Sequence, residues 1–269
     1  MIHLFNKWDD IRGMLKRKKL LLFLDFDGTL AAIVDHYKSA TILRKSKMLL
    51  SQIAKNSECR VAIVSGRSLS DVKKRVGLKN IIYVGNHGLE AVGPGIKYTS
   101  FAGASIRKLF RKIKSDLVKR VGKIKGILIE DKGLTISVHY RRVDRKDLAL
   151  VKQVFFEIMW QSYHKDQKID FCEGKKVLEI KPAVEWNKGS AVLWLMKRLR
   201  KNGYRQKVFP IFIGDDATDE TAFIALKNKG LCIRVGCGKA SAAQYCLKDI
   251  NQVARFLKAI FDFKSDGIS

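Results

Sequence analysis

The feature that most restricts the fold of this chain is an alternation of short apolar segments with amphipathic ones. The apolar segments lie at residues 20–26, 60–65, 81–84, 208–213 and 231–235. A membrane-spanning helix needs about 20 apolar residues, so segments this short have the length of buried strands instead. Helical spacing of apolar positions occurs at residues 48–54, 69–76, 190–200, 218–227 and 253–261. Apolar strands separated by such helices predict an α/β fold in which helices cover both faces of a parallel sheet.

The middle of the chain has a different pattern. Gly93-Pro94-Gly95 interrupts the alternation, because glycine and proline are the strongest local breakers. After it we expect helices near residues 106–121 and 148–163, with paired short strands at 127–130, 134–139, 169–172 and 177–180. This pattern predicts an α+β module of residues 94–182 inserted into a core domain of residues 1–93 and 183–269.

The charge of the chain is strongly positive. Lysine and arginine number 53 against 26 aspartate and glutamate residues, which gives a formal net charge of +27 among 269 residues. Such a chain attracts polyanions at low salt, so either a solvated lysine-rich surface or a nucleic-acid or other anionic partner fits. The densest basic segment, residues 107–125, also carries apolar residues at helical spacing and no alternating aromatic residues. It is therefore interpreted as a surface helix rather than a platform for single-stranded nucleic acid.

The cysteines and the N-terminus restrict the cellular setting. The five cysteines are scattered and include no Cys-x-x-Cys pair. This excludes a zinc knuckle and gives no sign of a disulfide framework, so we expect most of them to be reduced core residues. No apolar signal segment with a cleavage site follows the basic residues 16–19. We therefore expect a cytoplasmic protein without a membrane span.

Polar motifs follow the expected core strands. In an open parallel sheet, residues directly after the strands gather at one edge, where ligands bind. The first segment is Asp25-Phe26-Asp27-Gly28-Thr29-Leu30, and the second is Ser65-Gly66-Arg67. The third feature is Lys188 at the start of a helix, and the fourth is Gly214-Asp215-Asp216-Ala217-Thr218-Asp219-Glu220.

The electrostatics of these motifs predict a metal and a phosphate. Two like charges about 4 Å apart cost about 1 kcal/mol in water and about 4 kcal/mol at an effective dielectric constant of 20. If Asp25, Asp27 and Asp215 converge, with or without Asp219, they therefore need a cation among them. Hard carboxylate oxygens without a histidine or cysteine cluster favour Mg²⁺. Ser65, Arg67 and Lys188 would complete a pocket for an anion, so the motifs predict a phosphate site.

In this order the motifs resemble those of phosphatases of the haloacid dehalogenase superfamily. More narrowly, the chain resembles the trehalose-6-phosphate phosphatase family. The segments that carry this resemblance are 61–67, Gly85-Asn86-His87-Gly88-Leu89-Glu90, 137–141, Gly174-Lys175-Lys176-Val177-Leu178-Glu179-Ile180-Lys181-Pro182 and 209–220. The resemblance implies a Rossmann-like parallel-sheet core of the haloacid dehalogenase type with an inserted α+β cap, and a Mg²⁺-dependent hydrolysis of trehalose 6-phosphate in trehalose biosynthesis.

The resemblance also implies roles for the acidic motif residues. Asp25 would attack phosphorus and form an aspartyl phosphate, which divides one difficult step into two. Asp27 would act as general acid and then as general base. Mg²⁺ would be held by Asp25, by the backbone carbonyl of Asp27 and by Asp215. Asp216 and Asp219 would orient these ligands rather than bind the metal themselves.

The remaining motif residues would bind the substrate. Ser65, with Gly66, would contact the phosphoryl group, and Lys188 would balance the charge of Asp25 and the phosphate. Arg67 fits either a substrate contact or a structural ion pair. His87 likewise fits either a sugar contact or a structural role.

The inserted module would act as a lid that excludes bulk water and selects the sugar. Its candidate sugar-binding residues are Lys132, His139, Arg141, Glu173, Lys175 and Glu179, each of which could instead be a surface charge. The alternatives are a phosphatase for sucrose phosphate, mannosylglycerate phosphate or another sugar phosphate, and a basic nucleic-acid-binding or scaffold protein. A trehalose-phosphate synthase is a possible partner.

Overall fold

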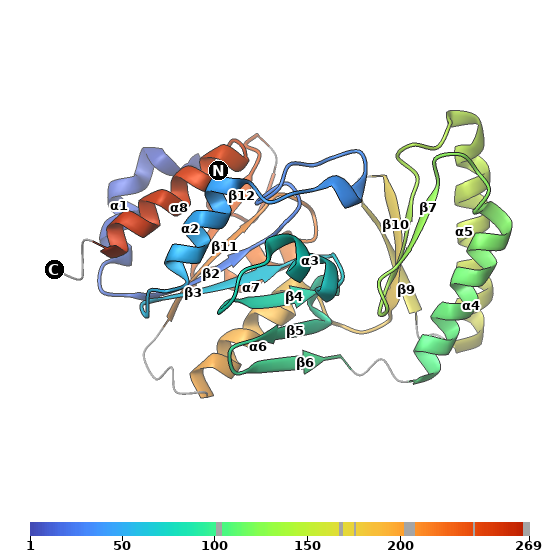
Figure 1. Ribbon diagram of the computed structural model, residues 1–269, viewed down its shortest axis with the longest axis horizontal. Coiled ribbons are helices and arrows are strands. Elements are labelled where there is room, and N and C mark those ends of the chain that lie inside the picture. Colours follow the sequence, from blue (N-terminus) through green and yellow to red (C-terminus); the bar gives the residue numbers. More distant parts are fainter. Residues whose placement is uncertain (101–103, 167–168, 175, 202–207, 239, 266–269) are drawn as a thin grey trace. The chain divides into compact units, whose positions relative to one another are not determined.

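The computed structural model describes residues 1–100, 104–166, 169–174, 176–201, 208–238 and 240–265 (Figure 1). The chain divides into two compact units. The first consists of Met1–Thr99 and Trp186–Ser269, and the second of Ser100–Glu185. None of the helices in the described ranges is long and apolar enough to cross a membrane.

The first unit is built on a sheet that in the described residues has nine strands, in the order β1-β13-β12-β11-β2-β3-β4-β5-β6. Neighbours from β1 to β4 run parallel, whereas β5 and β6 are antiparallel to their neighbours. The prediction of a mixed α/β fold with a mainly parallel sheet is therefore confirmed. The strands are β1 (Ile2–His3), β2 (Lys19–Leu24), β3 (Cys59–Val64), β4 (Ile82–Gly85), β5 (Glu90–Gly93), β6 (Ile96–Thr99), β11 (Val208–Gly214), β12 (Leu231–Val235) and β13 (Tyr245–Leu247).

Helices pack on both faces of this sheet because its central strands are apolar on both sides. Along β2, Leu22 and Leu24 pack with α1, α2, α3 and α8 in one hydrophobic cluster. Phe23 packs with α6 and α7 in a second cluster. Figure 1 shows α2 and α8 on one side of the sheet and α6 on the other. The helices are α1 (Trp8–Leu15), α2 (Arg44–Ile53), α3 (Leu69–Val76), α6 (Lys188–Lys201), α7 (Glu220–Leu226) and α8 (Ile250–Ser265), with 3₁₀ turns η1 (Leu4–Lys7), η2 (Tyr37–Ser39) and η3 (Asn86–Gly88).

The segment around Gly93-Pro94-Gly95 is a hairpin turn inside the first unit. Gly93 pairs with Ile96, so Pro94 and Gly95 form a two-residue loop between β5 and β6. Gly95 has φ of +71°, a conformation that glycine adopts without strain. An expected boundary at residue 93 would cut this hairpin, whereas the first unit extends to Thr99. Glycine and proline mark a turn in both cases, so the local pattern does not distinguish a hairpin from a domain boundary.

The second unit is a four-stranded antiparallel sheet with two helices on one face. The sheet order is β7-β8-β10-β9. Val138 of β8 and Leu178 of β10 pack against α4 and α5 in a third hydrophobic cluster. The elements are α4 (Ala104–Val121), β7 (Leu128–Asp131), β8 (Ile136–His139), α5 (Arg145–Asp166), β9 (Ile169–Gly174) and β10 (Val177–Pro182).

An aromatic cluster lies in the first unit, close to Thr99, where the chain leaves this unit, and to Trp186, where it returns. Tyr98, in β6, stacks on Trp186 with ring centroids 5.4 Å apart. Tyr98 also contacts Trp194 of α6 at 4.7 Å. The Trp186 indole nitrogen donates to the carbonyl oxygen of Gly88 at 2.7 Å. The residues that bracket the second unit are therefore anchored to each other within the first.

Two of the five cysteines form a disulfide, which the sequence did not suggest. Cys237 and Cys246 are bonded, with Cα atoms 5.5 Å apart. Cys237 follows β12, and Cys246 lies in β13 beside Arg234 of β12. Sheet pairing therefore brings the two cysteines together, and their separation in sequence carries no signal of this. The expectation that most of the cysteines are reduced is confirmed for Cys59, Cys172 and Cys232, of which Cys59 and Cys232 are buried, whereas the bonded pair was not expected.

The three free thiols should react slowly with alkylating reagents in the native protein. Burial raises the pKa of Cys59 to about 11 and that of Cys232 to about 12. Burial and, secondarily, Glu179 raise the pKa of Cys172 to about 11. Because only the thiolate reacts, iodoacetamide at pH 8 should label Cys59 and Cys172 about a hundred-fold, and Cys232 about a thousand-fold, more slowly than in the urea-unfolded chain. Mass spectrometry of labelled peptides measures this, and rapid labelling of Cys172 would contradict it.

Candidate active site

Strand register places the polar motifs at one edge of the sheet. Leu24, the last residue of β2, pairs with Ile213 of β11 and with Ile63 of β3. The residues that follow these strands, Asp25, Asp215 and Ser65, therefore lie at the same carboxyl-terminal edge. The backbone N–H of Asp25 donates to the carbonyl of Ile213 at 2.9 Å, which continues the ladder up to the motif.

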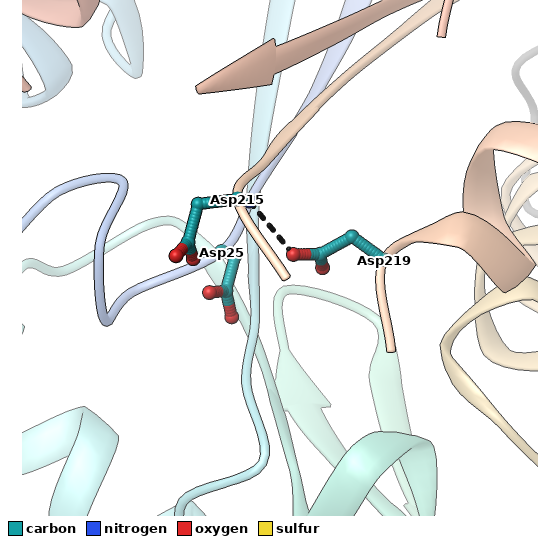
Figure 2. Close-up of side chains that lie close together, drawn as sticks. All are labelled: Asp25, Asp215 and Asp219. Atoms are coloured by element: carbon teal, nitrogen blue, oxygen red, sulfur yellow. Dashed lines mark hydrogen bonds between the residues drawn. The ribbon is translucent and has the colours of Figure 1, made fainter. Parts of the chain in front are cut away.

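Two carboxylates from distant segments lie next to each other at this edge. Asp25, Asp215 and Asp219 each offer one oxygen, and these oxygens all lie within 4.8 Å of one another. Figure 2 shows the carboxyl groups of Asp25 and Asp215 side by side. Gly28 makes this possible, because a Cβ there would lie 2.3 Å from the Asp215 carboxylate. Its φ of +79° also suits glycine.

A buried lysine bridges two of the acidic groups. The Lys188 ammonium donates to Asp25 Oδ1 at 2.9 Å and to Asp219 Oδ1 at 2.7 Å. Burial would lower the pKa of Lys188, but the Asp219 and Asp25 carboxylates outweigh burial and raise it well above its ordinary value. Burial raises the pKa of Asp25 despite Lys188, with neighbouring acids adding to the effect. A single lysine thus leaves this acidic cluster short of positive charge.

Asp216 and Asp219 organise the turn that carries Asp215. Asp219 Oδ2 accepts the backbone N–H groups of Asp215 and Asp216 at 2.9 and 3.0 Å (Figure 2). Asp216 Oδ1 accepts from the backbone and hydroxyl of Thr218 at 2.8 and 2.7 Å. Burial would raise the pKa of Asp216, but Lys188 and the Thr218 hydrogen bonds outweigh it, so this pKa is lowered. Both oxygens of Asp219 therefore have partners: Oδ1 accepts from Lys188, and Oδ2 accepts from the two backbone N–H groups.

The carboxylate oxygens of Asp25 and Asp215 suit a small, hard divalent cation. Asp219 already accepts from Lys188 and from the two backbone N–H groups of its own turn, whereas the Asp25 and Asp215 carboxyl groups lie side by side at the edge of the sheet (Figure 2). Their donor atoms are all oxygen, the ligand type that Mg²⁺ prefers. The residues present therefore fit a divalent metal held by Asp25 and Asp215.

Ser65, Gly66 and His87 form the neighbouring part of the edge. The side chain of Ser65 is buried, and its hydroxyl accepts the backbone N–H of Arg67 at 3.2 Å. The backbone N–H of His87 donates to the Ser65 carbonyl at 3.1 Å. The His87 ring lies against Gly66, where a Cβ would come within 2.4 Å of it. His87 also helps to lower the pKa of Asp216, although less than Lys188 and Thr218 do.

Arg67 forms an ion pair with Asp27. Its Nε and Nη2 atoms donate to Asp27 Oδ2 and Oδ1, both at 2.6 Å. This is the paired geometry in which arginine binds a carboxylate most strongly. Of the two roles considered for Arg67, the structure shows the ion pair. Asp27 keeps its side chain 41% exposed, whereas that of Arg67 is 8% exposed.

The candidate sugar-binding residues of the second unit fall into two groups. Lys132 and Glu179 form a buried ion pair at 3.0 Å, and His139 contacts Glu130 at 2.9 Å. Strand register places Glu130, Ser137, Glu179 and Cys172 in one row, on the face away from the third hydrophobic cluster.

Glu173 and the two remaining candidates lie elsewhere. Glu173 shares a row with Leu178 and accepts hydrogen bonds from Tyr140 and Lys152, so it lies toward α5. The structure therefore does not bring Glu173 together with Lys132 and Glu179. Arg141 is exposed two residues after the end of β8, and Lys175 lies outside the described residues.

The sequence motifs did not identify one buried arginine that lies at the site, Arg234. Arg234 donates to the backbone carbonyl of Asp215 at 2.8 Å and to Glu220 Oε1 at 2.6 Å. It lies inside the apolar segment 231–235, where a charged side chain must find a partner. Glu220 also accepts from Ser241 and from the backbone of Ala242, which ties the loop after β12 to the turn of Asp215. The sequence feature that could have indicated this role is a single arginine within an otherwise apolar strand segment.

Comparisons of this chain with known proteins all point to the same protein family. The family model described as trehalose-phosphatase matches residues 23–251. Trehalose-phosphate phosphatase B of Arabidopsis thaliana is 33% identical over 96% of this chain and 71% of its own length. Trehalose-phosphate phosphatase of Mycobacterium marinum is 34% identical over 87% of this chain and 60% of its own length. A crystal structure of a trehalose-6-phosphate phosphatase related protein aligns with a TM-score of 0.78 at 25% identity, covering 92% of this chain and 99% of that one.

Proposed function

This chain belongs to the trehalose-phosphatase family, and we propose that it hydrolyses trehalose 6-phosphate to trehalose and inorganic phosphate. The observation that carries this proposal is the convergence of Asp25 and Asp215 beside Lys188 at the carboxyl-terminal edge of the sheet. Asp25, the backbone carbonyl of Asp27 and Asp215 would hold Mg²⁺. When bound, this ion would supply the positive charge that a phosphate dianion and two carboxylates require.

The side chains of the first motif would carry out the bond changes. An oxygen of the Asp25 carboxylate attacks phosphorus, and the bond from phosphorus to the sugar oxygen breaks. Asp27 enters this step protonated and gives its proton to that departing oxygen, which leaves it as the carboxylate that pairs with Arg67. Asp27, now a carboxylate, takes a proton from the water that attacks the aspartyl phosphate and regenerates Asp25. Its greater exposure suits a group that must meet both a sugar and a water.

Ser65 and Lys188 would bind and balance the phosphate. The Ser65 hydroxyl, which accepts from Arg67, can donate its own proton to a phosphoryl oxygen. Lys188 holds Asp25 in place and offsets negative charge as the phosphate arrives. Gly66 leaves room for the His87 ring beside Ser65, and we propose that His87 would contact the substrate from there.

The second unit would serve as a lid that selects the sugar. Its polar row supplies carboxylate and ammonium groups of the kind that bind sugar hydroxyls, with Lys132, His139 and Glu179 as the candidates. A lid would also admit a single water while excluding bulk solvent from the aspartyl phosphate. A trehalose-phosphate synthase, which makes this substrate, remains the proposed partner.

A panel of sugar phosphates tests the substrate. Phosphate release should give a kcat/KM for trehalose 6-phosphate at least about ten-fold above those for sucrose, mannosylglycerate and glucose phosphates. A difference of this size corresponds to about 1.4 kcal/mol of transition-state binding. Equal values across the panel would replace this proposal with that of a general sugar-phosphate phosphatase.

Removal of divalent metal should abolish turnover and lower stability. Without a cation, the Asp25 and Asp215 carboxylates repel each other inside a buried site. After treatment with EDTA, phosphate release should stop, and adding back Mg²⁺ should restore it and raise the melting temperature in a concentration-dependent way. The Asp215→Asn variant is the control, because its melting temperature should respond less to Mg²⁺. Full activity in EDTA with an unchanged melting curve would rule out the metal.

A further inference from the structure

The arginine that pairs with Asp27 is itself held by a second carboxylate. Arg67 Nη1 donates to Asp71 Oδ2 at 2.7 Å, from the first turn of α3. Arg75, one turn further along α3, donates its Nε to the same oxygen at 2.7 Å. Burial would raise the pKa of Asp71, but the hydrogen bonds and charges of Arg75 and Arg67 outweigh it and lower this pKa. Asp71 therefore stays a carboxylate between two guanidinium groups.

The same two arginines fix the chain that follows the first motif. Arg67 Nη2 donates to the backbone carbonyl of Tyr37 at 2.9 Å. Arg75 Nη1 donates to the carbonyls of Lys38 and Ala40 at 2.9 and 2.7 Å. Each of the three nitrogens of Arg67 thus has an acceptor, and Asp71 is the one that ties this side chain to α3. A group held by several short bonds in a partly buried network keeps one orientation.

We propose that Asp71 is a positioning residue for the phosphatase reaction, because by holding Arg67 through Nη1 it fixes the orientation of the Asp27 carboxyl group. The inference rests on the proposed role of Asp27 as the acid that protonates the departing sugar oxygen. A shift of a reacting group by about 1 Å can cost about a hundred-fold in rate. Loss of the Asp71 charge frees Arg67 to turn, and Asp27 turns with it.

The identity of the leaving group separates this role from a merely structural one. A sugar alkoxide is a strong base and departs only when it receives a proton, whereas p-nitrophenolate is a weak base and departs without one. The value of kcat/KM covers the steps up to the breaking of the phosphorus–oxygen bond. A misplaced Asp27 should therefore lower kcat/KM for trehalose 6-phosphate far more than kcat/KM for p-nitrophenyl phosphate.

The experiment compares both substrates in Asp71→Asn, Asp71→Glu and a matched control. We expect Asp71→Asn to lower kcat/KM for trehalose 6-phosphate by about 30- to 100-fold and for p-nitrophenyl phosphate by less than about 3-fold. Asp71→Glu keeps the charge and should recover most of the loss. The control is Asp262→Asn, which removes an exposed pair with Lys258 at the same i,i+4 spacing on α8. It should change neither value.

Each outcome decides the matter. Equal losses for both substrates, or no loss for either, would overturn the proposal, and so would a loss that Asp71→Glu does not recover. If Asp71→Asn does not fold, Arg75→Gln takes its place, with the same selective loss expected at about 5-fold.

The wild-type protein separates this inference from the proposed substrate. If it prefers another sugar phosphate, the substrate proposal fails, and the same comparison made with that sugar phosphate still decides the role of Asp71. Absence of any phosphatase activity would overturn both.

Discussion

Asparagine in place of Asp25 should abolish the hydrolysis of trehalose 6-phosphate, with kcat falling by about 10⁴-fold or more. The carboxylate lies beside Asp215 and accepts a hydrogen bond from Lys188, the setting expected of a nucleophile for phosphorus. An amide of the same shape has no negatively charged oxygen with which to form an acyl phosphate. Phosphate release measures the loss, and acid-quenched reactions should show phosphate bound to the wild-type protein and none bound to the variant.

Asp9→Asn serves as the matched control, because the Asp9 side chain is 89% exposed on α1 and should not affect turnover. Retention of activity by Asp25→Asn would place the nucleophile elsewhere. Salt-dependent binding of nucleic acid by a wild-type protein that releases no phosphate would favour the alternative based on the net charge of +27.

Alanine in place of Lys188 should lower the free energy of unfolding by about 3–5 kcal/mol. Lys188 is fully enclosed, and its removal leaves Asp25 and Asp219 facing each other without their shared cation. Urea unfolding in EDTA measures the change. Lys197→Ala, which removes an exposed lysine from the same helix, should cost less than about 0.5 kcal/mol.

The loss caused by Lys188→Ala should also depend on pH. Burial, outweighing Lys188, raises the pKa of Asp219 from 3.8 to about 6. The stability linked to this proton is fully present below pH 3.8 and is lost as pH rises through 6. Without Lys188 the pKa of Asp219 rises further, so the destabilisation should be larger at pH 8 than at pH 5. Adding Asp219→Asn should reduce this difference and leave the part due to Asp25, which loses the same lysine, and a loss independent of pH would contradict the proposed charge balance.

Local patterns predicted the fold where strands are buried on both sides. The apolar segments 20–26 and 208–213 correspond to β2 and β11, because a central parallel strand has no polar face to obscure its pattern. The short strands toward the two ends of the sheet give a weaker signal, so β1, β13, β5 and β6 were not anticipated. A strand of two to four residues is too short to show the alternation of apolar and polar residues that identifies a strand in a sequence.

At the site, residue types were predictable but their partners were not. The order of the motifs along the chain, with strand ends at one edge of the sheet, was enough to bring Asp25 and Asp215 together. The motif alone could not decide whether Arg67 contacts the substrate or forms a structural ion pair. That choice depends on how close Asp27, which is 40 residues earlier in the chain, lies to Arg67 in the folded protein. Glu173 differs from Glu179 in facing α5, which follows from strand register and not from the closeness of the two residues in sequence.

The stacking of Tyr98 on Trp186 has a consequence for how such a chain can be rebuilt. Because these two rings touch, the polypeptide leaves and re-enters the first unit at neighbouring points. Residues 100–185 can then be exchanged for another module, or replaced by a short glycine-serine bridge, without opening a strand pairing of the large sheet. The anchor thus marks a modular junction, at which evolution or an engineer can change the inserted unit while leaving the acidic cluster of the first unit in place.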